Sequence, residues 1–280
     1  MDFSSRERIR SPVVSGLFYP EEKTAVEAAL CSFGLENGIG GNAAAIIAPH
    51  GAWKISGATA GAAFTAAAGR AGKQGGPGEI TKVVILGTLH NPSEEGLFLS
   101  DSLFFETPLG NLLVDQELCE ELTSCTTLFE INDIPHLREH TIEVLLPFIK
   151  FCFPGAAIIP VLMGGSQPSL ISALARALDI VFESLIGEVL FVASANLSHN
   201  KDYKTARFQA EECLRLLGGK KSGEFTEAIF NGRISVCGAP TVAALLASGV
   251  LEGKAARTGP LKKALGEQGQ TVYYGAVSFE

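Results

Sequence analysis

Short apolar runs alternate along the chain with longer stretches whose apolar residues recur at helical spacing. Four runs are too short for typical helices and are bounded by turn residues, so each predicts a buried strand. They are AAAIIAPH (43–50), TKVVILGTLH (81–90), AAIIPVLMGG (156–165) and EVLFVASANLSH (188–199). The tail TVYYGAVSFE (271–280), rich in aromatic and β-branched residues, is strand-like as well.

Helices are predicted between these strands. Their expected ranges are 21–33, 51–70, 114–125, 138–153, 168–187, 205–219, 220–232 and 239–251. Pro147 is expected to kink or break the segment 138–153, because proline lacks the amide hydrogen that a helix interior needs. Strands that alternate with helices are typical of parallel βαβ units. The fold class predicted is therefore α/β, with one three-layer α/β/α domain over residues 1–280 and a mostly parallel central sheet.

The composition supports a sizeable core and disfavours two kinds of partner. Hydrophobic residues make up 46% of the 280 residues, and 22 basic against 30 acidic side chains leave a net charge of −8. That charge gives no electrostatic basis for binding nucleic acid. The segment 1–14 lacks the apolar stretch of a secretory signal, and the longest apolar runs fall short of the roughly 20 residues of a membrane span. We therefore expect a soluble, cytoplasmic protein with neither a nucleic-acid nor a membrane partner.

Common catalytic motifs are missing from the sequence. No GxGxxG follows a predicted strand, and the glycine-rich pieces lack the Lys-Ser/Thr pair of a P-loop, which argues against a nucleotide site. No GxSxG elbow is present, which disfavours a serine hydrolase. The six cysteines form no CxxC pair, which argues against a zinc ribbon.

Three of the five histidines, His50, His90 and His199, stand just past the end of a predicted strand. In an α/β sheet the ligand crevice lies outside the carboxyl ends of the strands, so these imidazoles can meet there although they are far apart in sequence. Histidine is the commonest metal ligand and the side chain that titrates nearest neutral pH. A single such histidine is more often a hydrogen-bonded structural residue or a helix cap. The three together predict a metal or acid–base site.

A cysteine and a fourth histidine extend the set of candidates. Cys237 stands just before a predicted helix, where the helix dipole favours a thiolate; the alternative is a buried, inert thiol. His140 and Glu143, three residues apart in REHTIE, would share one helix face. They form either a charged surface at a helix start or a supporting acid–base pair that points into the crevice. His136 is expected in a loop.

An ordered set of short motifs spreads over nearly the whole chain. In order they are SPVVSGLFYP (11–20), IIAPHGAW, VVILGTLHNP, TPLG, EHTIEVLLPF, ASANLSH, VCG and YYGAVSF. By this set the chain resembles the Memo-like family, known in bacteria and archaea as AmmeMemoRadiSam system protein B. The resemblance implies a fold like that of class III extradiol ring-cleaving dioxygenases, with residues 1–20 as an N-terminal arm packed on the domain.

The resemblance also implies a metal pocket. The family's two histidines and one cysteine fall on His50, His90 and Cys237, with iron or copper as the expected divalent metal and zinc compatible as well. A nearby Asp and His of the family fall on Asn196 and His199. A carboxylate is thus replaced by an amide, which weakens any acid–base or oxidative role that needs it, and His199 takes a supporting or acid–base role.

Two further departures from the family pattern lie close to these positions. The usual His-Ala-Gly-Tyr becomes His50-Gly51-Ala52-Trp53, and a second histidine that many members carry after Glu143 is replaced by Leu145. We read the metal pocket as retained, while the departures leave its chemistry open.

Two functions follow as expectations from the resemblance. The first is a metal-dependent redox enzyme that acts on a small molecule beside a radical SAM protein and a companion protein of the same system. The second is a non-catalytic module that binds a peptide or other ligand in a dioxygenase-like pocket, because fold does not establish function. Genuine extradiol cleavage is not expected, because that chemistry normally uses two histidines and a carboxylate.

Overall fold

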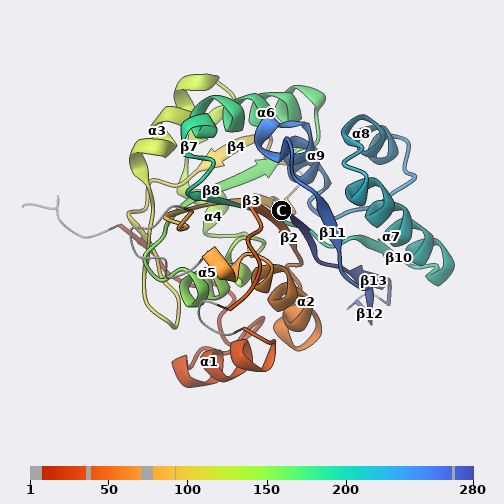
Figure 1. Ribbon diagram of the computed structural model, residues 1–280, viewed down its shortest axis with the longest axis horizontal. Coiled ribbons are helices and arrows are strands. Elements are labelled where there is room, and N and C mark those ends of the chain that lie inside the picture. Colours follow the sequence, from red (N-terminus) through yellow and green to blue (C-terminus); the bar gives the residue numbers. More distant parts are fainter. Residues whose placement is uncertain (1–7, 36–38, 71–77, 92, 267–268) are drawn as a thin grey trace, which may run out of the picture.

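An eight-stranded sheet forms the centre of the protein (Figure 1). The computed structural model describes residues 8–35, 39–70, 78–91, 93–266 and 269–280. In the middle of the sheet lie four parallel strands, in the order β2 (Ala45–Ala48), β9 (Val189–Ser194), β3 (Lys82–Thr88) and β8 (Ala157–Gly164). These are the four predicted apolar runs. Almost every residue of the four strands is buried, which explains why the runs are continuously apolar instead of alternating.

Antiparallel pairs complete the sheet at both sides. β14 (Val277–Phe279) runs antiparallel to β2 and to the edge strand β11 (Ala256–Thr258). On the other side β4 (Gly96–Leu99) runs antiparallel to β8 and parallel to β7 (Phe129–Ile131). Four of the seven neighbouring pairs are therefore parallel, which confirms the prediction of a mostly parallel sheet.

Helices cover both faces of the sheet, which confirms the three-layer α/β/α architecture (Figure 1). One face carries α1 (Lys23–Ser32), α2 (Trp53–Thr65) and α5 (Leu146–Cys152). The other carries α3 (Gln116–Cys125), α6 (Pro168–Phe182) and α9 (Ala239–Ala247), with α8 (Ser222–Phe230) beside α9 and α7 (Tyr203–Gly218) beside α8. No helix in the described parts of the chain is long and apolar enough to cross a membrane.

A second, smaller sheet adjoins the carboxyl ends of the parallel strands. It consists of β10 (Ser198–Asn200), β13 (Thr271–Tyr274) and β12 (Lys262–Leu265), all antiparallel. β10 begins four residues after the end of β9, and the Leu197 amide donates to the carbonyl of Tyr273. The small sheet thus extends from the edge at which β2, β3 and β9 end.

The predicted helix 138–153 differs from the structure in its first half. A 3-10 turn covers Glu143–Leu145, and α5 begins only at Leu146, with Pro147 in its first turn. Pro147 therefore starts a helix instead of breaking one, because first-turn amides have no intrahelical acceptor to lose. Before the turn, the carboxylate of Glu139 accepts the amides of His140 and Thr141. Because these amides donate to a side chain and not to helical backbone carbonyls, residues 138–142 stay outside the helix.

The N-terminal arm is held by Glu143, whose side chain is fully buried. Its carboxylate accepts the amides of Val13 and Val14 and the hydroxyl of Tyr19, and it pairs with the Arg10 guanidinium at 2.6 Å. β1 (Ile9–Arg10) also pairs with β5 (Phe104–Phe105), which is itself paired with β6 (Leu112–Leu113). The arm as described from residue 8 onward packs on the domain; residues 1–7 lie outside the described residues.

His136 ends the short helix α4 (Asp133–His136) and does not lie in a loop. Its ring is buried, and burial lowers the pKa of the imidazole to about 4. The carbonyl of His136 accepts from the Arg10 guanidinium. His136 is therefore a core residue next to the arm.

Glu143→Gln should unfold more easily than the parent protein by about 3 kcal/mol, because it leaves the buried Arg10 guanidinium without its opposite charge. Denaturant titration would measure the loss. Arg8→Gln is the matched control: Arg8 and Asp101 form an ion pair that is about half exposed, so its loss should cost under about 1 kcal/mol. Equal losses in the two variants would contradict the role given to Glu143.

Candidate metal centre

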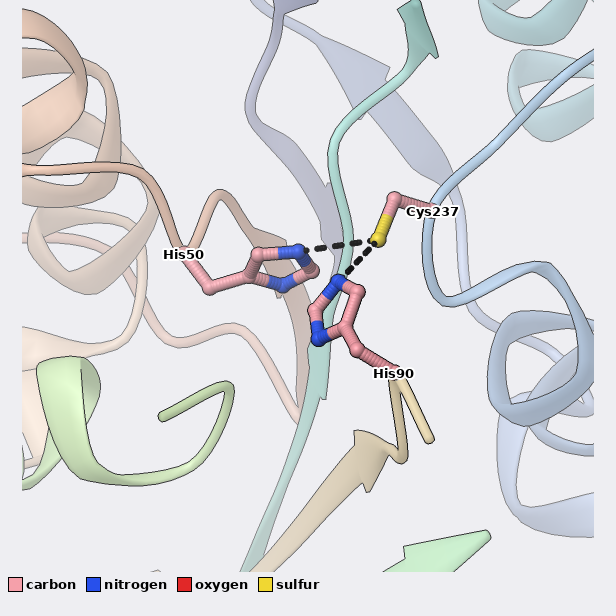
Figure 2. Close-up of side chains that lie close together, drawn as sticks. All are labelled: His50, His90 and Cys237. Carbon is pink, nitrogen blue, oxygen red and sulfur yellow. Dashed lines mark hydrogen bonds between the residues drawn. The ribbon is translucent and has the colours of Figure 1, made fainter. Parts of the chain in front are cut away.

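Three side chains from separate elements converge at the carboxyl edge of the parallel sheet (Figure 2). His50 follows β2, His90 follows β3, and Cys237 precedes α9. The Cys237 sulfur lies 3.2 Å from Nε2 of His50 and 3.0 Å from Nε2 of His90. Both rings therefore present the same nitrogen to one sulfur, as Figure 2 shows. His50 is buried, whereas His90 is exposed and Cys237 is half-buried.

Backbone hydrogen bonds bring Cys237 to this edge. The amide of Asn196 donates to the carbonyl of Cys237, and the amide of Cys237 donates to the carbonyl of Asn196, each at 3.0 Å. Gly238 follows with a φ of +94°, and a Cβ there would lie 2.3 Å from the carbonyl oxygen of Ser194. Only glycine permits this approach, so the VCG motif places the thiol against the end of β9.

A hydrogen-bond chain sets the tautomer of His50. The hydroxyl of Ser194 donates its single proton to the carbonyl of Thr141 at 2.6 Å. Towards His50 Nδ1, at 2.8 Å, the same oxygen can only accept, so Nδ1 carries a proton. In the neutral ring Nε2 is then unprotonated, and its lone pair faces Cys237.

Glu139 fixes His90 in the same way. Nδ1 of His90 lies 3.1 Å from both carboxylate oxygens, and the amide of His90 donates to one of them at 2.8 Å. Burial opposes the charge of this carboxylate, but hydrogen bonds from His140 and His90 outweigh burial and hold the pKa of Glu139 far below its usual range. Glu139 is thus a permanent acceptor that turns Nε2 of His90 towards Cys237. A carboxylate behind a histidine ligand is common at metal sites.

His140 lies beside the three converging groups. Its Nδ1 is 3.0 Å from the Glu139 carboxylate, and its ring stacks on His90 with the centroids 4.9 Å apart. On its other side the His140 ring contacts the ring of Phe18 in the arm, and the two ring centroids lie 4.7 Å apart. His90, Glu139 and His140 form a second group of possible ligands, but the Glu139 oxygens in it already accept ring and amide protons. His140 therefore packs beside the candidate ligands, and we do not count it among them.

The thiol and the rings shift each other's protonation. Burial alone would raise the pKa of Cys237, but the neighbouring His50 and His90 outweigh burial and lower the pKa of the thiol to about 5. The hydrogen bond with Cys237, followed by that with Glu139, raises the pKa of His90 to about 10. At neutral pH the metal-free pocket thus holds a thiolate that shares a proton with imidazole. The same donors suit a cation.

The donor set fits a transition metal. The candidate donor atoms of His50, His90 and Cys237 lie within 4.8 Å of one another. Neutral imidazole and thiolate suit zinc, copper and iron, whereas magnesium and calcium prefer oxygen donors. Three protein donors leave a position for a further ligand, as in catalytic metal sites.

The other predicted site residues lie in three different places. Asn196 lies at the site, where its side-chain oxygen accepts the amide of His50 at 3.2 Å. Glu143 does not pair with His140, as the sequence suggested; its carboxylate binds the arm. His199 lies exposed on β10, and it lines a separate cavity of about 320 Å³ with Asn200, Lys201 and Gln270. The described structure does not bring His199 into either group of possible ligands.

Sequence analysis missed the two residues that orient the rings. Ser194 is the last residue of a predicted strand, and nothing in its sequence context marks it as a partner of His50. Glu139 directly precedes His140 in the sequence, but helical spacing favours Glu143 as the partner of His140. The available signal was the position of Glu139 directly before His140, where a carboxylate can accept the backbone amides that follow it. Trp53 was noted as a departure, and its indole N–H donates to the carbonyl of Val144.

Metal-free protein should react with iodoacetamide at Cys237 almost as fast at pH 6 as at pH 8, because a thiol with a pKa near 5 is thiolate at both values. Free N-acetylcysteine in the same solution should lose roughly 70-fold in rate over that range. Peptide mapping by mass spectrometry would give both rates. Buried Cys119 and Cys152, whose pKa values burial raises to about 12, serve as unreactive controls. A pH profile of Cys237 parallel to that of the free thiol would contradict the shared proton.

Comparisons with known proteins identify the family of this chain. The family model described as Memo-like protein matches residues 10–274. A MEMO1 family protein of Thermotoga neapolitana is 32% identical over 250 residues, which cover 85% of this chain and 87% of that protein. MEMO1 family proteins of Thermotoga maritima and Thermoplasma acidophilum are 29% and 26% identical, and the matches cover 85% of this chain and 87% and 85% of those proteins. The chain belongs to the Memo-like family.

Proposed function

We propose that this protein binds one divalent transition metal through Nε2 of His50, Nε2 of His90 and Sγ of Cys237. The observation that carries the proposal is the convergence of two imidazole Nε2 atoms on the sulfur of Cys237. Each ring is held in that orientation by an acceptor on its other nitrogen, Ser194 or Glu139. Lone pairs that face each other repel unless a proton or a cation lies between them. A thiol has one proton for two rings, whereas a metal ion satisfies all three donors.

We propose further that the metal is iron or copper and that the protein is a redox enzyme for a small molecule. When bound, such an ion would supply electron transfer and polarisation of a substrate atom. The residues of the chain hold the ligand rings rigid, exclude water from the His50 side, and leave the His90 side open. The thiolate supports a redox metal, because sulfur donors suit copper and iron.

Extradiol cleavage does not fit the donor set. That chemistry uses two histidines and one carboxylate as ligands. Here the third donor is a thiolate. The nearby carboxylate of Glu139 accepts from the far nitrogen of His90. Catechol should therefore give no ring-opened product.

A binding role without catalysis is the second candidate. Asn196 favours it, because an amide occupies the position of the family's carboxylate and bonds to the His50 backbone. The ligand would be a peptide or a modified side chain, and its binding would survive removal of the metal. On the family resemblance alone, we also propose that a radical SAM protein and a companion protein act beside this chain. Co-purification from the native cells tests that proposal.

Anaerobically purified protein should contain about one equivalent of iron, copper or zinc, measured by elemental mass spectrometry. His50→Ala and Cys237→Ser should each weaken binding of the metal by at least about 100-fold, since two donors cannot hold the ion as three do. His199→Ala is the matched control and should bind normally, because His199 lies outside the group. Metal content that is absent from the parent protein, or unchanged in His50→Ala, would overturn the proposal.

Glu139→Gln should keep all three ligands and still weaken metal binding by about 10- to 100-fold. An amide offers His90 only a neutral oxygen, and its N–H₂ group faces the amides that the carboxylate accepted. Competition with a chromophoric chelator gives the affinity. Glu130→Gln, at an exposed surface position, is the control and should bind as the parent does. An affinity of Glu139→Gln within twofold of the parent would contradict the orienting role.

A further inference from the structure

Tyr274 carries a hydroxyl group without a partner beside the candidate metal centre. The residue lies at the end of β13 and is only 6% exposed. Among the described residues its hydroxyl forms no hydrogen bond, although a buried phenol usually has a partner. The preceding Tyr273 points to the opposite face of the strand, where its ring contacts that of Tyr203. The two neighbouring tyrosines thus have different surroundings.

Gly51 gives the Tyr274 side chain room next to His50. A Cβ at position 51 would lie 3.0 Å from Cε1 of Tyr274 and 3.1 Å from its hydroxyl oxygen. Either distance is closer than ordinary van der Waals contact, so a side chain at position 51 would require the phenol, and the Ser56 hydroxyl at 3.1 Å, to move by a few tenths of an ångström. Gly51 directly follows the ligand candidate His50. The missing side chain at position 51 therefore leaves room for the phenol next to His50.

The charge of Cys237 reaches this phenol. Burial, and after it the negative charge of Cys237, raise the pKa of Tyr274 above its ordinary value. The phenol is therefore neutral at physiological pH and keeps its proton. A neutral phenol offers an O–H donor that is free to bind a ligand atom.

We propose that Tyr274 donates a hydrogen bond to an anionic ligand atom bound at the position that His50, His90 and Cys237 leave open. Gly51 is the residue that admits the phenol to that position. The inference rests on the proposed metal site and adds a substrate class to it. A metal ion and an O–H donor on the same ligand atom select small anions, or the anionic oxygen of a larger molecule.

The test uses the full-length protein loaded with Co²⁺, whose visible absorption changes when an anion enters the metal coordination sphere. Azide is the probe. Tyr274→Phe should bind Co²⁺ within twofold of the parent and azide at least about tenfold more weakly, since a hydrogen bond to a charged group is lost. Tyr273→Phe is the matched control and should bind azide within twofold of the parent.

Gly51→Ala tests the second half of the inference. Gly51→Ala should weaken azide binding to a similar extent as Tyr274→Phe. The double variant Gly51→Ala/Tyr274→Phe should show no further loss of azide affinity, because the phenol has already been displaced or removed. The backbone of Gly51 is not among the glycines with positive φ, so alanine is compatible with its conformation. Losses that add in the double variant would overturn the role of Gly51.

The outcomes separate this inference from the proposed function. Failure of the parent protein to bind Co²⁺ overturns both. If all variants bind Co²⁺ and Tyr274→Phe binds azide as the parent does, the metal site stands and the role of Tyr274 is wrong. If the parent binds Co²⁺ but no azide, the anion position itself is refuted.

Discussion

The buried carboxylate of Glu139 is the interaction on which the rest of the site depends. It accepts three backbone amides, those of His90, His140 and Thr141, and two imidazole N–H groups. Five donors on one carboxylate repay the cost of burying its charge, which is otherwise high. This arrangement also determines the local backbone. The amides that Glu139 accepts are unavailable to a helix, so the chain at 139–142 stays irregular and passes directly under the ligand rings.

That short segment connects both histidine ligands to the N-terminal arm. Glu139 orients His90, and the carbonyl of Thr141 accepts the Ser194 hydroxyl that orients His50. Two residues further on, Glu143 binds the arm through two backbone amides, a phenol and a guanidinium. The arm in turn places Phe18 against His140. The arm and the metal pocket are therefore built on the same five residues, which explains how a terminal segment far from the sheet edge comes to line the pocket.

Two negatively charged groups, Glu139 and Cys237, have different roles in the pocket. Glu139 stays behind the rings and gives them orientation, while the negative charge next to the open position comes from Cys237. A hard carboxylate oxygen is thus exchanged for a soft, polarisable sulfur among the ligands. Asn196 brings no charge to the edge, and its amide holds the His50 backbone instead. In our proposal the neutral Tyr274 hydroxyl faces the open position, which suits an anionic ligand.

Much of the fold and part of the site could be read from local patterns. Continuous apolar runs with turn residues at their ends identify strands buried on both faces, and their alternation with helices implies a parallel sheet whose carboxyl ends share one edge. That argument places His50 and His90 together, because each directly follows such a strand. The same argument also brings His199 to this edge, but five residues beyond the end of β9 the chain has already entered the small sheet, where His199 lines a separate cavity.

Tertiary structure alone decided the remaining contacts. Cys237 reaches the histidines through a backbone bridge to Asn196, forty-one positions away, and no spacing in the sequence encodes that pairing. Helical periodicity paired His140 with Glu143, but periodicity does not register that Glu139 captures the amides of the first turn. Ser194, Gly51 and Tyr274 acquire their roles from neighbours on other strands. Sequence determines which segments can be buried and how strands are ordered along the chain, because those depend on local hydrophobicity; which polar groups meet depends on distant backbone geometry.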